Sequence, residues 1–154
     1  MAEKGYSKQE GLDAKGGTLR LKAVLENVPV AIDCVSRVAQ SAGFDQSALY
    51  EIQLAVDEVC ANVVQHAYEG TEPGDMEITC LLEDQRLTIR VRDWGWGFDP
   101  DEVEVPDIEA PLEERTLGGL GLFIVRTVMD RVAFTLDPDL GNELTMSKRL
   151  QVAA

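Results

Sequence analysis

The chain has 154 residues, which fits a single compact domain and leaves no room for a second catalytic one. Hydrophobic residues make up 45% and charged residues 27% of the chain, as in folded globular proteins, which argues against global disorder. With 28 acidic and 14 basic residues, the formal net charge of -14 opposes general binding to nucleic acids or to anionic membranes.

The beginning of the chain predicts a flexible tail followed by a strand. Residues 1–17 are polar and contain glycine, with no apolar period. They also lack the apolar region of a signal peptide, and no run approaches the roughly 18 apolar residues that span a bilayer, so we expect a cytoplasmic protein without membrane contact. From Thr18 onward, apolar and polar residues alternate as in a strand with one buried face. The apolar members are Leu19, Leu21, Ala23 and Leu25.

Two helices are expected after this strand. Asn27 supplies an N-cap and Pro29 a first-turn proline for the first helix, which Gly43 can end. Asp45 can cap the second helix. The apolar stripe of the second helix consists of Ile52, Val56, Val59 and Val63. Such a stripe requires that face to lie against a sheet or another helix.

The rest of the chain predicts a hairpin with a tight turn at Asp84 and Gln85, a long acidic segment, a third helix and two final strands. The acidic segment, residues 99–117, carries three prolines, and connections of this length in a small domain are usually lids or binding loops. The helix that begins near Gly118 is apolar nearly all round, so it is expected to be buried. The expected strands are residues 76–82, 87–91, 132–136 and 144–150. This order predicts an α+β domain with helices on one face of a mixed or antiparallel sheet.

The cysteines and the histidine do not form a catalytic or metal constellation in the sequence. Cys34, Cys60 and Cys80 are odd in number and contain no CxxC pair, so we expect buried thiols rather than a disulfide framework or a zinc site. His66 is the sole histidine and lies about 240° around the helix from Cys60, so the two cannot act as a base and a nucleophile within that helix. We expect His66 to make local contacts at a helix end.

Glu58 and Asn62 lie four residues apart on the second predicted helix. Their side chains therefore stack on one face, about 5–6 Å apart at Cβ. A carboxylate beside an amide oxygen suits a hard divalent cation such as Mg²⁺. Taken alone, the pair is also what an ordinary solvated helix face contains, and this alternative stays open.

Asp93 closes a predicted strand just before a glycine turn. This places one acceptor at the mouth of whatever lies between sheet and helices. A buried carboxylate needs a donor, and the exocyclic amine of a purine is one candidate. The alternative is an ordinary Asx turn.

Gly119 and Gly121 stand at the start of the third helix, where unpaired N–H groups and the helix dipole favour an anion such as phosphate. A sharp turn that merely requires glycine is the alternative. Arg115 is the one cation of the acidic segment and lies next to this point, so we expect it to contact a phosphate or a partner. Neither glycine cluster completes a dinucleotide fingerprint, and no P-loop motif is present.

Three motifs in this order are more specific than each alone. Residues 58–68 (EVCANVVQHAY), 93–98 (DWGWGF) and 119–125 (GLGLFIV) resemble the N, G1 and G2 boxes of the GHKL ATPase superfamily. The resemblance covers about residues 19–150. The short domain, the HAY ending and the GLGLFIV helix are most similar to the anti-sigma factor serine/threonine kinases.

The resemblance implies a Bergerat ATP-binding fold over residues 18–150. This is a two-layer α/β sandwich with helices on one face of a mixed, mostly antiparallel sheet, and a lid over ATP at about residues 99–117. By motif position, Asn62 would ligate Mg²⁺, Glu58 would be catalytic, as a base or by polarising the attacking hydroxyl, and Asp93 would accept from the adenine amine.

The glycines of the boxes have implied roles as well. Gly95 and Gly97 would let adenine and lid approach closely, and Gly119 and Gly121 would cradle phosphate. Two features depart from the usual pattern: the lid is very acidic, and two tryptophans, Trp94 and Trp96, stand in the G1 box where smaller residues are frequent. Stacking on a purine and packing under the lid are both open for these rings.

The resemblance also implies partners. Members of the family phosphorylate a serine or threonine of a small STAS-domain anti-sigma antagonist, many also sequester a sigma factor, and they commonly form homodimers. Direct nucleic-acid binding is not expected. The alternative is a non-catalytic ATP-binding regulator that sequesters a protein partner. The catalytic domain of a histidine kinase is disfavoured, because no dimerisation helix with a phosphoacceptor histidine precedes it.

Overall fold

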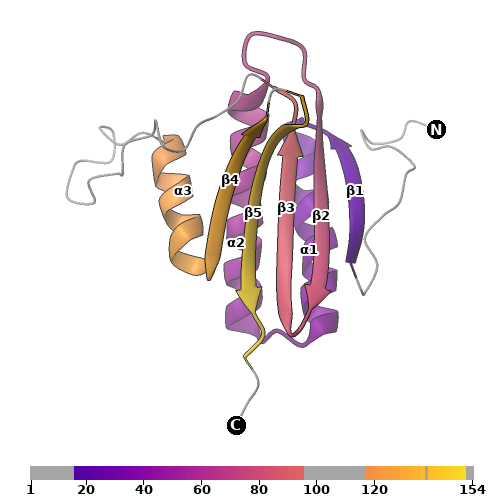
Figure 1. Cartoon of the computed structure of the whole chain (residues 1–154), viewed down its shortest axis with the longest axis vertical. Coiled ribbons are helices and arrows are strands. Elements are labelled where there is room, and N and C mark those ends of the chain that lie inside the picture. Colours follow the sequence, from indigo (N-terminus) through magenta and orange to yellow (C-terminus); the bar gives the residue numbers. More distant parts are fainter. Residues whose placement is uncertain (1–15, 96–116, 138, 152–154) are drawn as a thin grey trace.

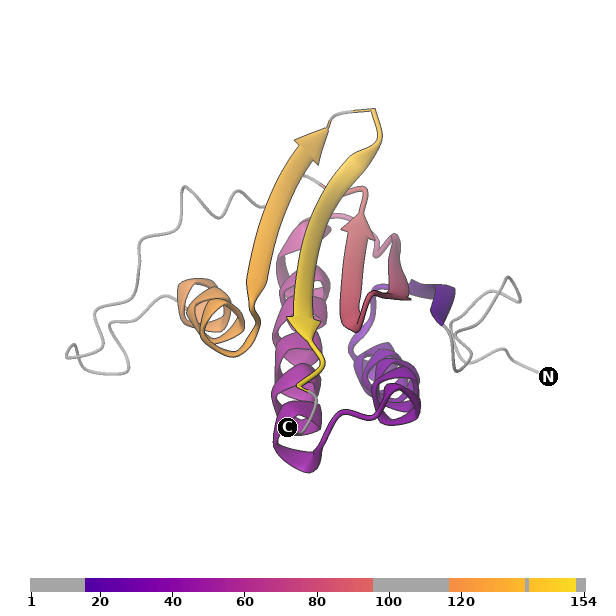
Figure 2. The same cartoon turned by 60° about the horizontal axis from the view of Figure 1, so that its bottom comes forward.

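The computed structural model describes residues 16–95, 117–137 and 139–151, with side chains of the third helix described from Leu122 onward. The elements are β1 (Gly16–Lys22), η1 (Leu25–Asn27), α1 (Val28–Ala42), α2 (Gln46–Asn62), η2 (Val63–Ala67), β2 (Asp75–Glu83), β3 (Arg86–Asp93), α3 (Leu117–Val128), β4 (Arg131–Asp137) and β5 (Gly141–Arg149). Helices α1 and α2 lie side by side against one face of the sheet, and α3 lies next to α2 at the β4 edge (Figure 1, Figure 2). The α+β class and the two-layer arrangement are confirmed.

The sheet has five strands in the order β1-β2-β3-β5-β4. The four strand pairs are all antiparallel, so of the mixed and antiparallel sheets that the element order leaves open, the described residues form the antiparallel one. The predicted hairpins β2–β3 and β4–β5 are present. In the second hairpin it is β5 that pairs with β3, so β4 forms the edge of the sheet. The segment between β3 and β4 therefore connects the middle of the sheet to its margin.

Several boundaries match local signals in the sequence. Asp84 and Gln85 have φ angles of 51° and 63°, the conformation of a two-residue hairpin turn whose twist matches that of the strands. Asp45 Oδ1 accepts a hydrogen bond from Ala48 N at 2.8 Å, so it caps α2 as predicted. Gly43 has a left-handed φ of 104° and ends α1, also as predicted.

The first strand is displaced from its predicted limits. β1 begins at Gly16, inside the predicted tail, and ends at Lys22. It ends there because its partner β2 begins at Asp75, directly opposite Lys22. Leu25 therefore lies in η1 and is 64% exposed, although the alternation predicts it on the buried face of the strand.

The core lies between the sheet and the helices. The apolar stripes of α1 and α2 are buried against strand residues such as Ile78 and Ile89. Cys60 and Cys80 are buried within this core, where burial raises the pKa of each thiol to about 12, whereas Cys34 is half-buried. Two of the cysteines are thus inert buried thiols, as predicted. In the described part of the chain, no helix is long and apolar enough to cross a membrane.

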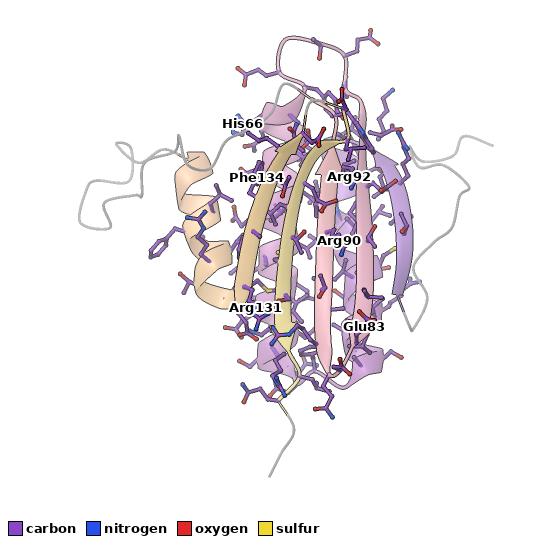
Figure 3. All side chains as sticks on the ribbon, in the orientation of Figure 1. His66, Glu83, Arg90, Arg92, Arg131 and Phe134 are labelled. Carbon is purple, nitrogen blue, oxygen red and sulfur yellow. The ribbon has the colours of Figure 1, made fainter. Side chains whose placement is uncertain are left out.

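The opposite face of the sheet is polar and carries arginines. Arg90 and Arg92 of β3 and Arg131 of β4 lie on the face turned toward the viewer in Figure 3. Arg92 Nη2 donates to Glu143 Oε2 on the neighbouring strand. Because the helices cover only the other face, a site enclosed between two layers can form only on the helix side.

Lys148 of β5 contacts both α3 and α2. Its Nζ donates to the carbonyl oxygen of Val128 at 2.6 Å and lies 3.1 Å from Glu51 Oε1, with its side chain 12% exposed. Lys148→Met should lower the free energy of unfolding by about 1–3 kcal/mol, because it leaves a helix-end carbonyl and a carboxylate without their donor. Urea titration measures the loss.

A matched control for this substitution is Arg37→Met, which removes an exposed pair with Asp33 on α1. Such a pair contributes about 0–1 kcal/mol. Equal losses for the two variants would contradict the linking role of Lys148.

Candidate nucleotide-binding site

A hollow with an empty volume of about 400 Å³ opens on the helix side of the sheet, near the end of β3. Its apolar lining is formed by Val59, Val63, Ala67, Val91, Leu122, Phe134 and Leu144. Its polar lining is formed by Asn62, Asp93 and Asn142. In Figure 1 the N-terminal end of α3 faces the same end of the molecule as the end of β3. Residues from three segments far apart in sequence, Asn62, Asp93 and Leu122, therefore line one hollow.

Asp93 occupies the floor of the hollow at the end of β3. Its side chain is buried, and its Oδ1 accepts from Gly95 N at 3.0 Å and from Asn142 Nδ2 at 2.9 Å. The bond to Gly95 N is an Asx turn, so the alternative weighed from the sequence is also present. Because the carboxylate lines the hollow as well, the turn fixes its position without hiding it from a ligand.

Gly95 packs against the end of η2. A Cβ at this position would lie 1.8 Å from the carbonyl oxygen of Ala67, so no other residue fits this backbone path. The neighbouring Tyr68 hydroxyl accepts from Trp94 N at 2.9 Å and donates to Asp75 O at 2.6 Å. The turn after β3 is thus held against the helix by one close backbone contact and one bridging hydroxyl.

Asn62 projects into the hollow from the last turn of α2. Its Nδ2 is buried and has no hydrogen-bond partner among the described residues, a rare state for a native polar atom. The sequence alone left open that Asn62 belongs to an ordinary solvated helix face. Its buried amide nitrogen excludes that alternative. An unpaired amide in a hollow fits a ligand with acceptor oxygens, such as a phosphate.

Glu58 lies one turn before Asn62 and is partly buried. Burial raises the pKa of its carboxyl, and the charge of Asp57 raises that pKa further. Glu58 is not among the described residues that line the hollow.

The other predicted residues are only partly described. Gly119 and Gly121 fall in the first turns of α3, which begins at Leu117. Leu117 therefore belongs to this helix and not to the predicted lid. Gly97, Arg115 and the remaining lid residues lie outside the described part of the chain.

His66 and Trp94 each contact a charged side chain. His66, labelled in Figure 3, lies in η2, and its Nδ1 is 3.6 Å from Glu69 Oε2, in agreement with a local role at a helix end. The Trp94 ring is stacked by Arg20, whose guanidinium carbon is 4.5 Å from its centroid. Trp94 is not among the described residues that line the hollow, and one face of its ring lies against Arg20.

Two features of the site were missed in the sequence. The five residues of η2 form a π-helical turn, a shape found frequently at functional sites, and no residue pattern announced it. Asn142 did carry a signal. It occupies an inward position in the alternation of β5, ahead of Leu144 and Met146, where an apolar residue is the rule.

Comparisons with known proteins agree with this geometry. A family model described as a histidine kinase-like ATPase domain matches residues 21–148. The serine-protein kinase RsbW of Listeria monocytogenes serovar 1/2a is 34% identical over 132 residues, 83% of this chain and 84% of that protein. RsbW of Halalkalibacterium halodurans is 36% identical over 137 residues, 86% of this chain and 82% of that protein.

Two solved structures share the fold. The RsbU and RsbW domains of a Mycobacterium tuberculosis protein match with a TM-score of 0.63 at 18% identity, over 89% of this chain and 33% of that chain. The histidine kinase domain of a blue-light activated kinase from Erythrobacter litoralis matches with a TM-score of 0.50 at 24% identity, over 67% of this chain and 45% of that chain. The present chain thus spans less than half of either solved chain. By its family match and its RsbW identities, the chain belongs to the histidine kinase-like ATPase domains, among the RsbW-type serine-protein kinases.

Proposed function

We propose that this chain transfers the γ-phosphoryl group of ATP to a serine or threonine hydroxyl of a small STAS-domain anti-sigma antagonist. Family membership implies ATP binding and protein kinase activity. The observation that supports the site is that Asn62, Asp93 and Leu122 of α3 line one hollow. They lie in the three boxes, which the resemblance assigns to metal, adenine and phosphate.

The residues present fit a magnesium–nucleotide complex. Asp93 supplies an acceptor for the adenine amine, and Asn62 supplies an amide whose nitrogen has no partner among the described residues. The first N–H groups of α3 lack partners within the helix and favour phosphate. When bound, Mg²⁺ neutralises phosphate charge. Asn62 would hold it through the amide oxygen, while the amide nitrogen can donate to a phosphate oxygen.

Glu58 has the properties of the base in this proposal. The attacking hydroxyl oxygen forms a bond to the γ-phosphorus while the bond to the ADP oxygen breaks, and the hydroxyl proton passes to Glu58. A raised pKa brings a carboxylate closer to the value that suits a base near neutral pH. Glu58 is not among the described residues that line the hollow, so in this mechanism it contacts the protein substrate rather than the nucleotide.

The partner assignments complete the proposal. Phosphorylation of the antagonist would alternate with sequestration of a sigma factor, so that the state of the nucleotide and of the antagonist selects the partner. We also propose that the chain acts as a homodimer in the cytoplasm, without direct contact to nucleic acid.

A second function is compatible with the same hollow. It is a regulator that binds ATP and sequesters a protein without phosphorylating it. The two functions share the nucleotide site. They differ in whether the γ-phosphoryl group leaves it.

The decisive experiment measures binding and transfer separately. Titration calorimetry with magnesium ATP tests the hollow, and γ-labelled ATP with a co-encoded STAS protein tests transfer. We expect binding, and label on the STAS protein that disappears when its acceptor serine is replaced by alanine.

Each outcome decides one part of the proposal. Bound ATP without label on any STAS protein would favour the sequestering regulator. No heat at millimolar ATP would overturn the nucleotide site itself.

A further inference from the structure

Asn142 is a buried polar residue whose role the motif positions do not assign. It is 8% exposed, stands second in β5 and lines the hollow beside Asp93. A buried amide on the core face of a strand is costly unless its groups are bonded, so its hydrogen-bond partners decide what it can do.

The contacts of Asn142 converge on the turn that carries Asp93. Its Nδ2 donates to Asp93 Oδ1 at 2.9 Å and lies 3.3 Å from the carbonyl oxygen of Gly95. Asp93 Oδ1 accepts a second bond from Gly95 N at 3.0 Å. A carboxylate oxygen has two lone-pair sites, so both sites of Oδ1 are occupied. Oδ2 remains as the acceptor for a ligand.

The backbone holds this arrangement in register. Asp93 and Asn142 are direct partners across β3 and β5. Gly141, which precedes Asn142, has a φ of 99°, and a Cβ there would lie 2.7 Å from Asp93 O. The two strands therefore approach closely at this point, which keeps the backbone of Asn142 directly opposite that of Asp93.

We propose that Asn142 is a positioning residue for base selection, acting through Asp93. By occupying Oδ1, it stops the carboxylate from rotating and keeps Oδ2 as a fixed acceptor, which favours a purine with an exocyclic amine. A base with a carbonyl oxygen at that position meets a fixed negative acceptor and is rejected. The inference rests on the proposed function, since it takes the hollow as the base pocket.

The test compares ATP with inosine triphosphate, whose base carries a carbonyl oxygen in place of the amine. Calorimetry gives the two dissociation constants for the unchanged protein, for Asn142→Leu and Asn142→Ala, and for the control Ser147→Ala. Ser147 is buried on the same strand, and its hydroxyl accepts from Arg86 Nη1 away from the hollow. Leucine is close to asparagine in size, while alanine leaves space that water can enter.

We expect the unchanged protein to bind ATP about 100-fold or more tightly than inosine triphosphate, as sites do that are built to accept a hydrogen bond from a ligand N–H group. Both Asn142 variants should reduce that ratio by about tenfold or more, the loss of one charge-assisted hydrogen bond. Ser147→Ala should keep the ratio.

Other outcomes overturn different statements. Equal losses of affinity for both nucleotides, or two Asn142 variants that fail to fold, would make Asn142 a structural residue and remove the inference while the proposed function stands. Failure of the unchanged protein to bind ATP would instead overturn the proposed function. Equal binding of both triphosphates by the unchanged protein would show that Asp93 does not distinguish the amine from the carbonyl group of the base.

Discussion

Glu58→Gln should abolish phosphoryl transfer while leaving ATP affinity nearly unchanged. The substitution keeps the size of the side chain and removes its ability to take a proton, and a general base contributes about 10²–10⁴-fold to a rate. Binding is expected to persist because Glu58 does not line the described hollow. Single-turnover transfer from labelled ATP to the STAS protein, with calorimetry beside it, separates the two quantities.

The pH dependence sharpens this prediction. Transfer needs the ionised carboxylate, so the rate should fall as pH decreases through the pKa of Glu58, which burial and Asp57 raise above 4.5. Asp57→Asn is the matched control: it removes one negative neighbour, so the acid limb should move to lower pH with transfer retained. Glu58→Gln should show no such limb. A large loss of ATP affinity in Glu58→Gln would assign Glu58 to binding instead.

Gly95→Ala should be the most destabilising single change at the site. The added Cβ would lie 1.8 Å from the carbonyl oxygen and 2.4 Å from the carbonyl carbon of Ala67, and both are backbone atoms. No side-chain rotation relieves such a clash, so the turn or η2 must move. We expect a loss of about 3 kcal/mol or more in the free energy of unfolding.

Loss of nucleotide binding should accompany this loss of stability, because Gly95 N and Gly95 O both bond to the Asp93–Asn142 pair. The control is Gly70→Ala, where φ is 82° and a Cβ would meet nothing within 4 Å. That change should cost about 1 kcal/mol through backbone strain alone. Urea unfolding and calorimetry measure both variants, and similar losses would show that the contact with Ala67 is not restrictive.

Local signals predicted most of the elements. The caps at Asp45 and Gly43 and the turn at Asp84 depend on neighbours within a few residues, so the sequence carries them directly. Strand order depends on pairings between distant residues. Alternation identifies a strand and its buried face, but it does not give the direction of the neighbouring strand, so the sequence left both a mixed and an antiparallel sheet open.

For the site as well, the sequence predicted the residues of local motifs but not their contacts. Asn62 and Asp93 were found because their motifs are local, and both line the hollow. Their contacts were not predictable: the bond from Asn142 to Asp93 joins residues 49 apart, and only strand pairing brings them together. The packing of Gly95 on Ala67 likewise needs the fold, since nothing near Gly95 in sequence indicates which backbone lies opposite.

The π-helical turn of η2 sets the direction in which Tyr68 leaves the helix. A wider turn accommodates one residue more than a regular α-helix does over the same rise. If the same residues continued as a regular α-helix, the residues after them would be rotated by about 100° around the helix axis. The Tyr68 hydroxyl would then point away from Trp94 and Asp75, so its two hydrogen bonds depend on the wider turn.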